Sequence, residues 1–394
     1  MVVCQRQDQR PGEHGQDVRA GHQVDRGHRS FSYISTSVSP VSPHARFRRW
    51  RAPVGARRVH PPAIFPIVPA VTAGRSPDTR ATVWDREMAA DVDRTRVASS
   101  ATRVHSRAMD RSHFIDTRLV GDARITMILD GHGYWAPELQ VPEAEWRAAL
   151  PQANAAGEVG IDFCGAHIAL GDASILIDLG FDDIPPERGH WATMRLRRTP
   201  GVEAVLAAIG VRAEEITHVL ITHAHGDHIA GAIAERDGRP VARFPNARHL
   251  IGRADWERNP ERNSPASLAA MHLGGLLSRG LLELVDGVRP VAPGVTFRHA
   301  PGESPGHSIV EVRSRGETFL HLGDLFHFPC EFEHLGWIPP GRDQATTILS
   351  RRDALERARD AGALLAFSHG VFPCWGRVSP EGEPAHWMYE VATR

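Results

Sequence analysis

His223-Ala224-His225-Gly226-Asp227-His228 is the most informative stretch of the sequence, because three imidazoles and one carboxylate fall within six residues. It follows residues 217–221, an apolar run that predicts a buried strand, and precedes residues 229–234, which are expected to open a helix. The polar side chains therefore belong to a turn at the C-terminal end of a strand. Open α/β sheets usually place their chemistry there, because a rigid scaffold fixes the loops.

The spacing within this stretch suits metal binding. Two imidazoles one residue apart in extended backbone, His223 and His225, point the same way and can share one ion. Gly226 permits a sharp change of direction, so that Asp227 and His228 can face a second position. Four ligand-type side chains are too many for one tetrahedral ion that also holds a water. Two metal ions are therefore predicted, and a solvated polar loop with satisfied histidines is the alternative explanation.

The stretch resembles the His-x-His-x-Asp-His signature of the metallo-β-lactamase superfamily. That resemblance implies further ligands downstream, and the chain offers His307, Asp324 and His369, each at the end of an apolar run. The ligand sets implied by the resemblance are His223, His225 and His307 for the first metal, Asp227, His228 and His369 for the second, with Asp324 bridging both. Asp178, in a turn that resembles the family's Asp-x-Gly turn, is expected to support the site or form the turn rather than to bind metal.

Strands and helices alternate along the chain, which predicts the α/β class. The resemblance covers roughly residues 114–387 and implies an αββα sandwich of two mixed β-sheets flanked by helices. Residues 124–130 are expected to form a strand that leads into a loop at 131–135, and residues 167–170 and 174–178 a pair of strands joined by Gly171-Asp172. Helices are expected from the Thr199-Pro200 cap to residue 209, over 267–278, and over 343–360.

The first part of the chain differs in composition from the rest. Before Met109 there are 18 arginines and nine acidic residues, whereas acidic residues predominate afterwards. This part lacks sustained periodicity and is rich in Arg, Ser, Pro and Gly, so residues 1–110 are predicted to be a disordered leader, and residues 111–394 the catalytic domain. A start of translation assigned too far upstream would explain this leader, with Met88 or Met109 as the true first residue, and an export signal after Arg48-Arg49 is the alternative.

The composition of the whole chain limits its partners. The 394 residues carry a net charge of −1, so no nucleic-acid partner is expected, and no segment is long and apolar enough to suggest a membrane span. Four cysteines without close pairing fit a reducing cytoplasm better than a disulfide framework. The expected partner is a small-molecule substrate, and the sequence leaves the oligomeric state open.

A site with two metals implies a hydrolytic mechanism. A water between the two ions loses its proton near neutral pH and becomes a bridging hydroxide that attacks the substrate, while the ions polarise its C=O or P=O bond. Zinc is the expected ion for an imidazole-rich site, and mixed nitrogen and oxygen ligands also admit Mn, Fe or Co. Asp227 and His327 are the candidate catalytic residues.

The branch of the superfamily follows from details of the motifs. An intact Asp324 argues against a true β-lactamase, and the order of motifs looks most like the lactonase and organophosphate (methyl parathion) hydrolase branch. His327 lies three residues after Asp324, where the acyl-homoserine lactonases carry a tyrosine, and can donate a proton in its place. Aromatic residues are expected to border the site: Trp135, Trp191, Phe326, Phe328, Trp337 and Trp375.

These aromatic residues favour an uncharged ester, lactone or phosphotriester as substrate. An acyl-homoserine lactonase, a thioesterase resembling glyoxalase II, which needs a basic site for glutathione, and a metal-binding protein without catalysis are the alternatives. A nucleic-acid binder acting through the Arg-rich leader is a further possibility, to be recognised by salt-dependent binding.

Overall fold

The computed structural model describes residues 113–181 and 189–390, and the predicted leader lies outside this range. The first sheet contains β1 (Ile115–Val120), β2 (Ala123–Trp135), β3 (Val159–Leu170), β4 (Ala173–Ile177), β5 (Arg197–Arg198), β6 (His218–Ile221), β9 (Arg248–Gly252) and β10 (Leu282–Val285). The second contains β11 (Val288–Ala292), β12 (Val295–His299), β13 (Ser308–Ser314), β14 (Glu317–His321), β15 (Leu364–Ala366), β16 (Gly376–Val378) and β17 (Trp387–Tyr389). A small hairpin pairs β7 (Ile233–Arg236) with β8 (Arg239–Ala242).

The helices are short except for α8. They are α2 (Glu143–Ala149), α3 (Gly189–Thr193), α4 (Val202–Ala208), α5 (Gly226–Ile229), α6 (Arg253–Glu257), α7 (Gly274–Ser278) and α8 (Gln344–Asp360). Single turns of other helix types are η3 (Ala213–Glu215), η4 (Ala269–Leu273) and η5 (Pro329–Phe332).

Both sheets are mixed. In the first, β1, β2, β3 and β4 pair antiparallel with one another in this order, and β4, β6, β9 and β10 pair in parallel. In the second, β14 and β15 are parallel and the other pairs are antiparallel. The parallel strands require long crossover connections, and the helices lie in these connections except for α2, which lies between the antiparallel strands β2 and β3.

Alternating side chains hold the two sheets together. On β2, Ile125 and Met127 enter the cluster between the sheets, whereas Ile128 faces the other way. On β13, Val310 and Val312 enter the same inner cluster, and Ile309 packs on the opposite face. This period of two is what a strand buried on both faces imposes, so each sheet has an inner and an outer apolar face.

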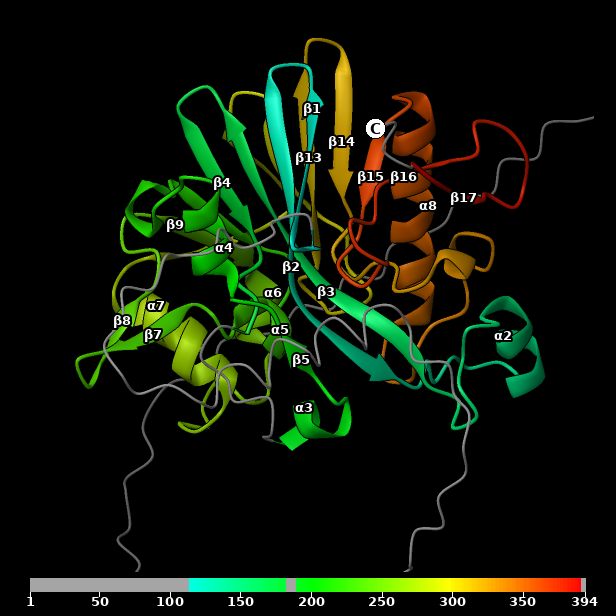
Figure 1. The fold of residues 1–394 in the computed structure, drawn as a ribbon, viewed down its shortest axis with the longest axis horizontal. Helices are drawn as coiled ribbons and strands as arrows, with labels where there is room; N and C mark the ends of the chain where they lie inside the picture. The colour runs from blue at the N-terminus through cyan, green and yellow to red at the C-terminus, as the bar shows by residue number, and fades with distance from the viewer. Residues whose placement is uncertain (1–112, 182–188, 391–394) are drawn as a thin grey trace, which may run out of the picture. The chain divides into compact units, whose positions relative to one another are not determined.

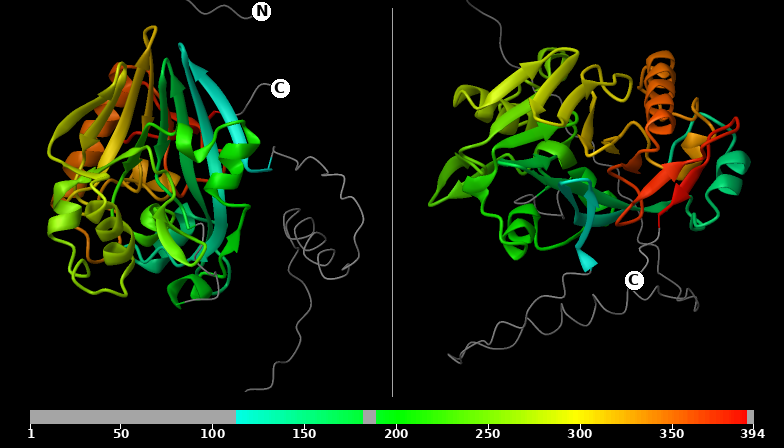
Figure 2. Two further views of the ribbon diagram at one scale, coloured as in Figure 1. Left: turned by 90° about the vertical axis from the view of Figure 1, so that its left-hand side faces the viewer. Right: turned by 90° about the horizontal axis from the view of Figure 1, so that it is seen from above.

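Helices cover the two outer faces. Val205 of α4 and Leu276 of α7 pack on the first sheet, and Ala354 and Leu355 of α8 pack on the second. Figures 1 and 2 show α8 on the outer side of the second sheet and the green helices around the first. The described part is the predicted αββα sandwich.

Several elements agree with the sequence predictions. The strand before the histidine motif is β6, the pair at 167–178 is β3 and β4, and Leu170 opposes Ala173 across the turn Gly171-Asp172. Helix α8 begins after Asp343, whose side chain accepts a hydrogen bond from the backbone N–H of Thr346. This cap satisfies one of the free amides of the first turn.

Four predicted elements differ. β2 continues through the predicted loop to Trp135, because residues 131–135 pair with β3 beyond a bulge at Leu129/Gly131. The helix expected over 229–234 ends at Ile229, since Gly231 donates its N–H to the carbonyl of Gly180 and the chain enters β7. The helix expected from the Thr199-Pro200 cap begins only at Val202, and the predicted helix at 267–278 divides into η4 and α7.

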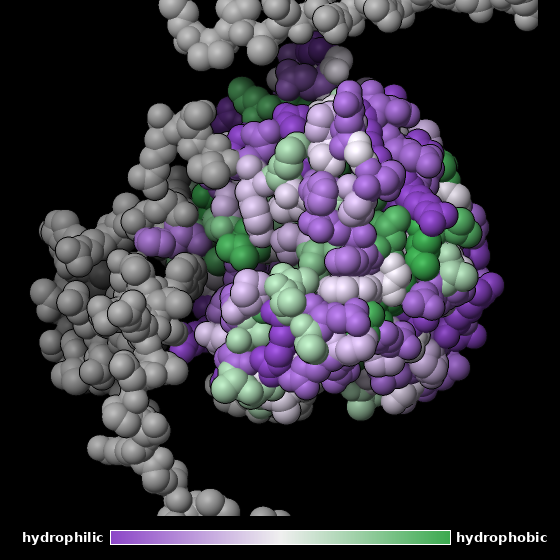
Figure 3. Space-filling model, turned by 90° about the vertical axis from the view of Figure 1, so that its right-hand side faces the viewer, coloured by the Kyte–Doolittle hydropathy of each residue, from purple (hydrophilic) through white to green (hydrophobic). Residues whose placement is uncertain are grey.

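One face of the described part is mainly polar. On the face in Figure 3, hydrophilic residues predominate and hydrophobic ones appear in small groups. Within residues 113–181 and 189–390, no helix has the length and apolar character needed to cross a membrane. Three free cysteines occur in this part, Cys164, Cys330 and Cys374.

Candidate metal centre

Loops from both sheets meet at the C-terminal ends of β6, β14 and β15. The backbone N–H of Ser308 donates to Thr222 O at 2.9 Å, which joins the start of β13 to the end of β6. The N–H of Ser368 donates to Gly323 O at 3.0 Å, which joins the loops that follow β15 and β14. These hydrogen bonds bring the predicted ligands together, although they lie far apart in the sequence.

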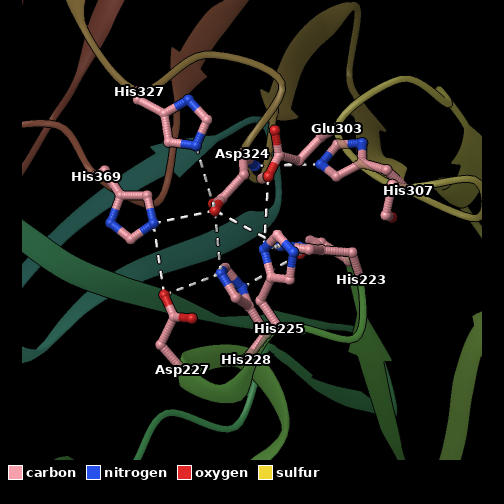
Figure 4. A network of polar contacts seen from close by, with 12 residues as sticks. His223, His225, Asp227, His228, Glu303, His307, Asp324, His327 and His369 are labelled. Carbon is pink, nitrogen blue, oxygen red and sulfur yellow. Dashed lines mark hydrogen bonds and ion pairs between the residues drawn. The ribbon is translucent and has the colours of Figure 1, made fainter. Parts of the chain in front are cut away.

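Asp324 lies at the middle of the site (Figure 4). Its Oδ2 is 3.0 Å from Nε2 of His369, 3.3 Å from Nε2 of His228 and 3.6 Å from Nε2 of His223. Asp227, on α5, turns its Oδ2 toward the same two imidazoles of the second predicted set, 3.2 Å from His228 and 3.4 Å from His369. Asp324 is therefore placed to serve two positions at once.

The ligand atoms form two groups that share Asp324. One contains His223, His225, Glu303 and Asp324, the other Asp227, His228, Asp324 and His369, and the atoms of each lie within 4.8 Å of one another. A tetrahedral ion with bonds of 2.0–2.1 Å separates its ligand atoms by roughly 3.4 Å, close to the distances above. Nε2 of His228 and Oδ1 of Asp324 are buried without a hydrogen-bond partner. The donor set thus fits divalent cations that bind nitrogen and oxygen.

His307 is buried beside the first group but is not part of it. Its Nδ1 donates to Ala300 O at 2.9 Å, which leaves Nε2 as the lone-pair nitrogen. That nitrogen accepts the backbone N–H of Asp324 at 3.1 Å. The predicted role of His307 as a ligand stays a prediction.

Hydrogen bonds at Nδ1 also fix two other histidines. His228 donates to Oδ2 of Asp178 at 2.9 Å, and His369 donates to the backbone oxygen of Asp162 at 3.0 Å. In each ring this leaves Nε2 directed at the carboxylates of the site. Such outer partners orient metal-binding histidines in many proteins.

Buried carboxylates also anchor the loops themselves. Asp178 accepts both the N–H and the hydroxyl of Thr222, at 2.7 and 3.0 Å. Asp255 on α6 accepts the N–H of Ala224 at 3.0 Å and that of Gly306, so it ties the two loops of the first group together. These contacts hold the loop geometry from outside the site.

Burial and neighbouring charges shift the pKa values of several side chains in the site. Burial lowers the pKa of His223 well below its ordinary value, which keeps the lone pair on its ring available. Burial opposes ionisation of Asp324, but His369, His228 and His223 together hold the pKa of its carboxyl well below the usual range. Burial likewise opposes protonation of His228, yet Asp227, Asp324 and Asp178 raise its pKa well above the ordinary value. A cation that binds there displaces protons from the histidines.

His327 lies next to Asp324, as predicted, with its Nε2 3.7 Å from Oδ2. Its ring stacks on that of His369, with centroids 5.5 Å apart. Burial disfavours its protonation, but Asp324 and Glu331 raise the pKa of His327 to about 10. Glu331 in turn accepts the backbone N–H of His327 and pairs with buried Arg351 on α8 at 3.2 Å.

A cavity of about 450 Å³ opens above these residues. Apolar side chains make up much of its wall: Trp135, Ile161, Phe163, Trp191, Met194 and Leu268. The polar lining is formed by His225, Asp227, Asp324, His327, Arg342 and His369.

Of the six aromatic residues expected at the site, Trp135 and Trp191 line this cavity. The prediction is wrong for Trp375, which packs between the sheets, and for Phe326, which stacks on Phe332 beneath α8. Phe328 stacks on Trp135 and belongs to a buried apolar cluster, and Trp337 packs against that cluster. Neither Phe328 nor Trp337 lines the cavity.

Sequence reasoning missed Glu303 and Arg342 in the site, and Asp162, Asp255 and Arg351 around it. Glu303 lies four residues before His307, within Pro301-Gly302-Glu303-Ser304-Pro305-Gly306-His307, so its closeness to a predicted ligand was an available signal. The others come from distant segments and carry no local signature.

Comparison with known proteins agrees with this geometry. Residues 168–369, just over half of the chain, match the Metallo-beta-lactamase superfamily. The chain belongs to this superfamily.

Individual relatives are more distant. An N-acyl homoserine lactonase of a Bacillus species is 27% identical over 175 residues, which cover 42% of this chain and 61% of the relative. A probable metallo-hydrolase of Mycobacterium tuberculosis is 24% identical over 174 residues, covering 40% of this chain and 54% of that one. The chain thus spans about three fifths or less of these relatives.

Two solved structures share the fold. AidC, a dizinc quorum-quenching lactonase, has a TM-score of 0.59 and 21% identity, with 71% of this chain and 99% of AidC covered. A probable metal-dependent hydrolase from Staphylococcus aureus has a TM-score of 0.60 and 21% identity, with 70% and 100% covered. At this identity the likeness supports the fold and leaves the chemistry to the residues of the site.

Proposed function

We propose that this protein is a binuclear metal-dependent hydrolase of uncharged esters, lactones or phosphotriesters. The observation that carries the proposal is the convergence of two ligand groups on Asp324 at the base of a largely apolar cavity. The metal ligands proposed are those of the sequence prediction: His223, His225, Asp227, His228, His307, Asp324 and His369. Zinc is the first ion to test, because imidazole predominates in the set.

When bound, two divalent ions would acidify water and polarise the C=O or P=O bond of the substrate. The side chains of the site would hold the cations, orient the ligands and supply a proton. Asp324 and Asp227 supply the negative charge that holds the cations, and Asp178 fixes His228 through its Nδ1. Asp324 and Glu331 raise the pKa of His327, which lines the cavity, so its ring can hold a proton and donate it to the leaving oxygen.

The cavity favours a neutral substrate with an apolar group. A volume of about 450 Å³ falls in the usual range for small-molecule sites, and Trp135, Phe163 and Trp191 supply flat apolar walls. Arg342 is the lining residue with a permanent positive charge, and it is paired with Glu303 at 2.6 Å. Apart from the metal positions and His327, the lining therefore offers an anionic substrate no positive charge that is not already paired.

N-acyl lactones are the first compounds to test, because relatives of this chain are named N-acyl homoserine lactonases. The experiment combines metal analysis of the purified protein with initial rates on N-acyl lactones, aryl esters, phosphotriesters and glutathione thioesters. Two ions per chain and a preference for a neutral substrate are expected. A clear preference for the glutathione thioester would favour the thioesterase alternative, and metal binding without any turnover would favour a non-catalytic member of the fold.

A further inference from the structure

A second cavity, of about 430 Å³, adjoins the cavity above the metal centre. Four residues line both cavities, so the two meet at one place: His225, Gly226, Leu268 and Arg342. Most of the other residues that line the second cavity belong to two segments, residues 254–261, which begin in α6, and residues 303–305 of the loop between β12 and β13. The proposed function assigns no part of the substrate to this second cavity.

The second cavity differs from the first in its chemistry. None of the described aromatic residues lines it, whereas tryptophan and phenylalanine rings line the first cavity. Apart from His225, its charged lining consists of two arginines and three acidic residues: Arg258, Arg342, Asp255, Glu261 and Glu303. Because the positive charges do not exceed the negative ones, this cavity suits a polar group without charge better than an anion.

Arg342, where the two cavities meet, has hydrogen-bonding capacity that the described residues leave unused. Its Nη2 lies 2.6 Å from Oε1 of Glu303, and its Nε is buried without a hydrogen-bond partner among these residues. A guanidinium carries five N–H donors. Arg351, also on the C-terminal side of the centre, instead donates to three backbone oxygens, those of Leu325, Leu335 and Trp337. The side chain of Arg342 is 23% exposed, so it can still donate to a bound molecule.

The lining of the first cavity indicates how a substrate lies. His327 and His369 line the first cavity but not the second. His327 is the proposed proton donor to the leaving oxygen, so the leaving side of the substrate faces the first cavity. The acyl or phosphoryl side then faces His225, Arg342 and the second cavity.

We propose that the second cavity binds the acyl or phosphoryl side of the substrate, and that Arg342 donates a hydrogen bond to a neutral oxygen acceptor there. This inference rests on the proposed function and narrows its substrate class. Since Glu303 balances the charge of Arg342, the guanidinium acts as a hydrogen-bond donor with little attraction for anions. The preferred substrate therefore has an apolar leaving group and an ether or carbonyl oxygen near the scissile bond on the acyl side.

The test compares two esters that differ in one group. p-Nitrophenyl methoxyacetate has an ether oxygen where p-nitrophenyl butanoate has a CH₂ group, and their aryl group suits the apolar first cavity. The ratio of their kcat/KM values is measured in wild type and in Arg342→Met, so the intrinsic reactivity of the esters cancels. In the variant this ratio is expected to fall by about 10–100-fold, the usual effect of losing a hydrogen bond from a charged donor. Damage to the fold or the metal centre would slow both esters alike and leave the ratio unchanged.

Three further variants examine the donor and the cavity separately. Arg342→Lys keeps a positive charge beside Glu303 and is expected to give an intermediate ratio. Arg289→Met is the matched control, because Arg289 also pairs with a glutamate, Glu283 at 2.8 Å, but lies on β11 and lines neither cavity. It should keep the wild-type ratio. Ala254→Leu narrows the second cavity and is expected to raise KM for the methoxyacetate but not for p-nitrophenyl acetate.

The outcomes separate this inference from the proposed function. If wild type hydrolyses both esters and Arg342→Met leaves their ratio unchanged, the role of Arg342 is overturned and the proposed function stands. An unchanged KM for the methoxyacetate in Ala254→Leu would overturn the assignment of the second cavity. A wild-type preference for an acyl group that ends in a carboxylate, lost in Arg342→Met, would overturn the neutral acceptor. A metal-loaded wild type that hydrolyses no ester, lactone or phosphotriester overturns the proposed function as well.

Discussion

Asp178→Asn is the substitution whose effect can be worked out most directly from the structure. Asp178 is buried, and its two oxygens accept three hydrogen bonds, from the N–H and hydroxyl of Thr222 and from Nδ1 of His228. Its φ of 58° is left-handed, a conformation that asparagine tolerates, so the backbone is expected to stay in place. The change therefore alters the hydrogen bonds and the charge but not the shape.

The expected cost falls on His228. An asparagine has one acceptor oxygen, which can replace Oδ1 and serve the N–H of Thr222, while its NH₂ group replaces Oδ2. The Nδ1–H of His228 then faces a donor, and a buried donor without an acceptor costs about 1–3 kcal/mol. A ring that instead moves this proton to Nε2 loses the lone pair aimed at the site. At about 1.4 kcal/mol per factor of ten, either route weakens the second ion by roughly 10–100-fold.

The assay is competitive metal titration, with urea unfolding as a measure of stability. Asp172→Asn, in the exposed turn between β3 and β4, is the control and should change neither quantity. If Asp178→Asn bound both ions as tightly as wild type, Asp178 would be only a turn residue and the orienting role derived from its contacts would be wrong.

Four other outcomes are expected. Asp324→Asn should empty the weaker metal position and lower turnover by several orders of magnitude with the fold intact, which metal analysis and circular dichroism would check; two bound ions and a normal rate would refute its bridging role. His327→Phe should keep the ring stacking and the metal content but lower kcat by about 10²–10⁴-fold if the histidine donates a proton. Burial lowers the pKa of His249 from 6.5 to about 4, so the unfolded chain takes up the proton first as the pH falls. The contribution of neutral His249 to the free energy of unfolding is therefore complete above about pH 6.5 and falls by up to about 3 kcal/mol toward pH 4. In His249→Gln, the free energy of unfolding measured in urea should change less between these two pH values. A chain beginning at Met109 should fold and bind metal like the full chain, because both sheets and the site lie within residues 113–390; loss of either property would place the leader in the catalytic domain.

The sequence predicts the parts of the site that depend on local spacing. The histidine motif needs only a strand, a glycine and four nearby side chains, and the structure places it at the end of β6 as expected. Asp324 and His369 are predicted by the family resemblance, and they lie 3.0 Å apart although 45 residues separate them.

The parts it does not predict depend on partners from other segments. Asp255 and Asp162 resemble ordinary acidic residues until α6 and β3 bring them against the ligand loops. Residues 131–135 contain two glycines and suggest a loop, but pairing with β3 keeps them extended and carries Trp135 to the cavity. Nearness in sequence is also misleading for side-chain direction, since Phe326 and His327 are neighbours and face the core and the cavity respectively.

The contacts around the site show how its geometry is maintained by the protein itself. His228, His307 and His369 each donate Nδ1–H to an oxygen that lies within or next to a strand: Asp178 follows β4, Ala300 follows β12, and Asp162 lies in β3. Those oxygens sit on segments anchored in the packed sheets, so the Nε2 atoms are directed by the fold rather than by their mutual contacts. Asp324 is the exception, because its carboxylate is surrounded mainly by the imidazoles themselves. The negative charge of Asp324 therefore depends on the cations for its balance more than any other part of the centre does. The imidazoles, in contrast, keep their positions through the scaffold.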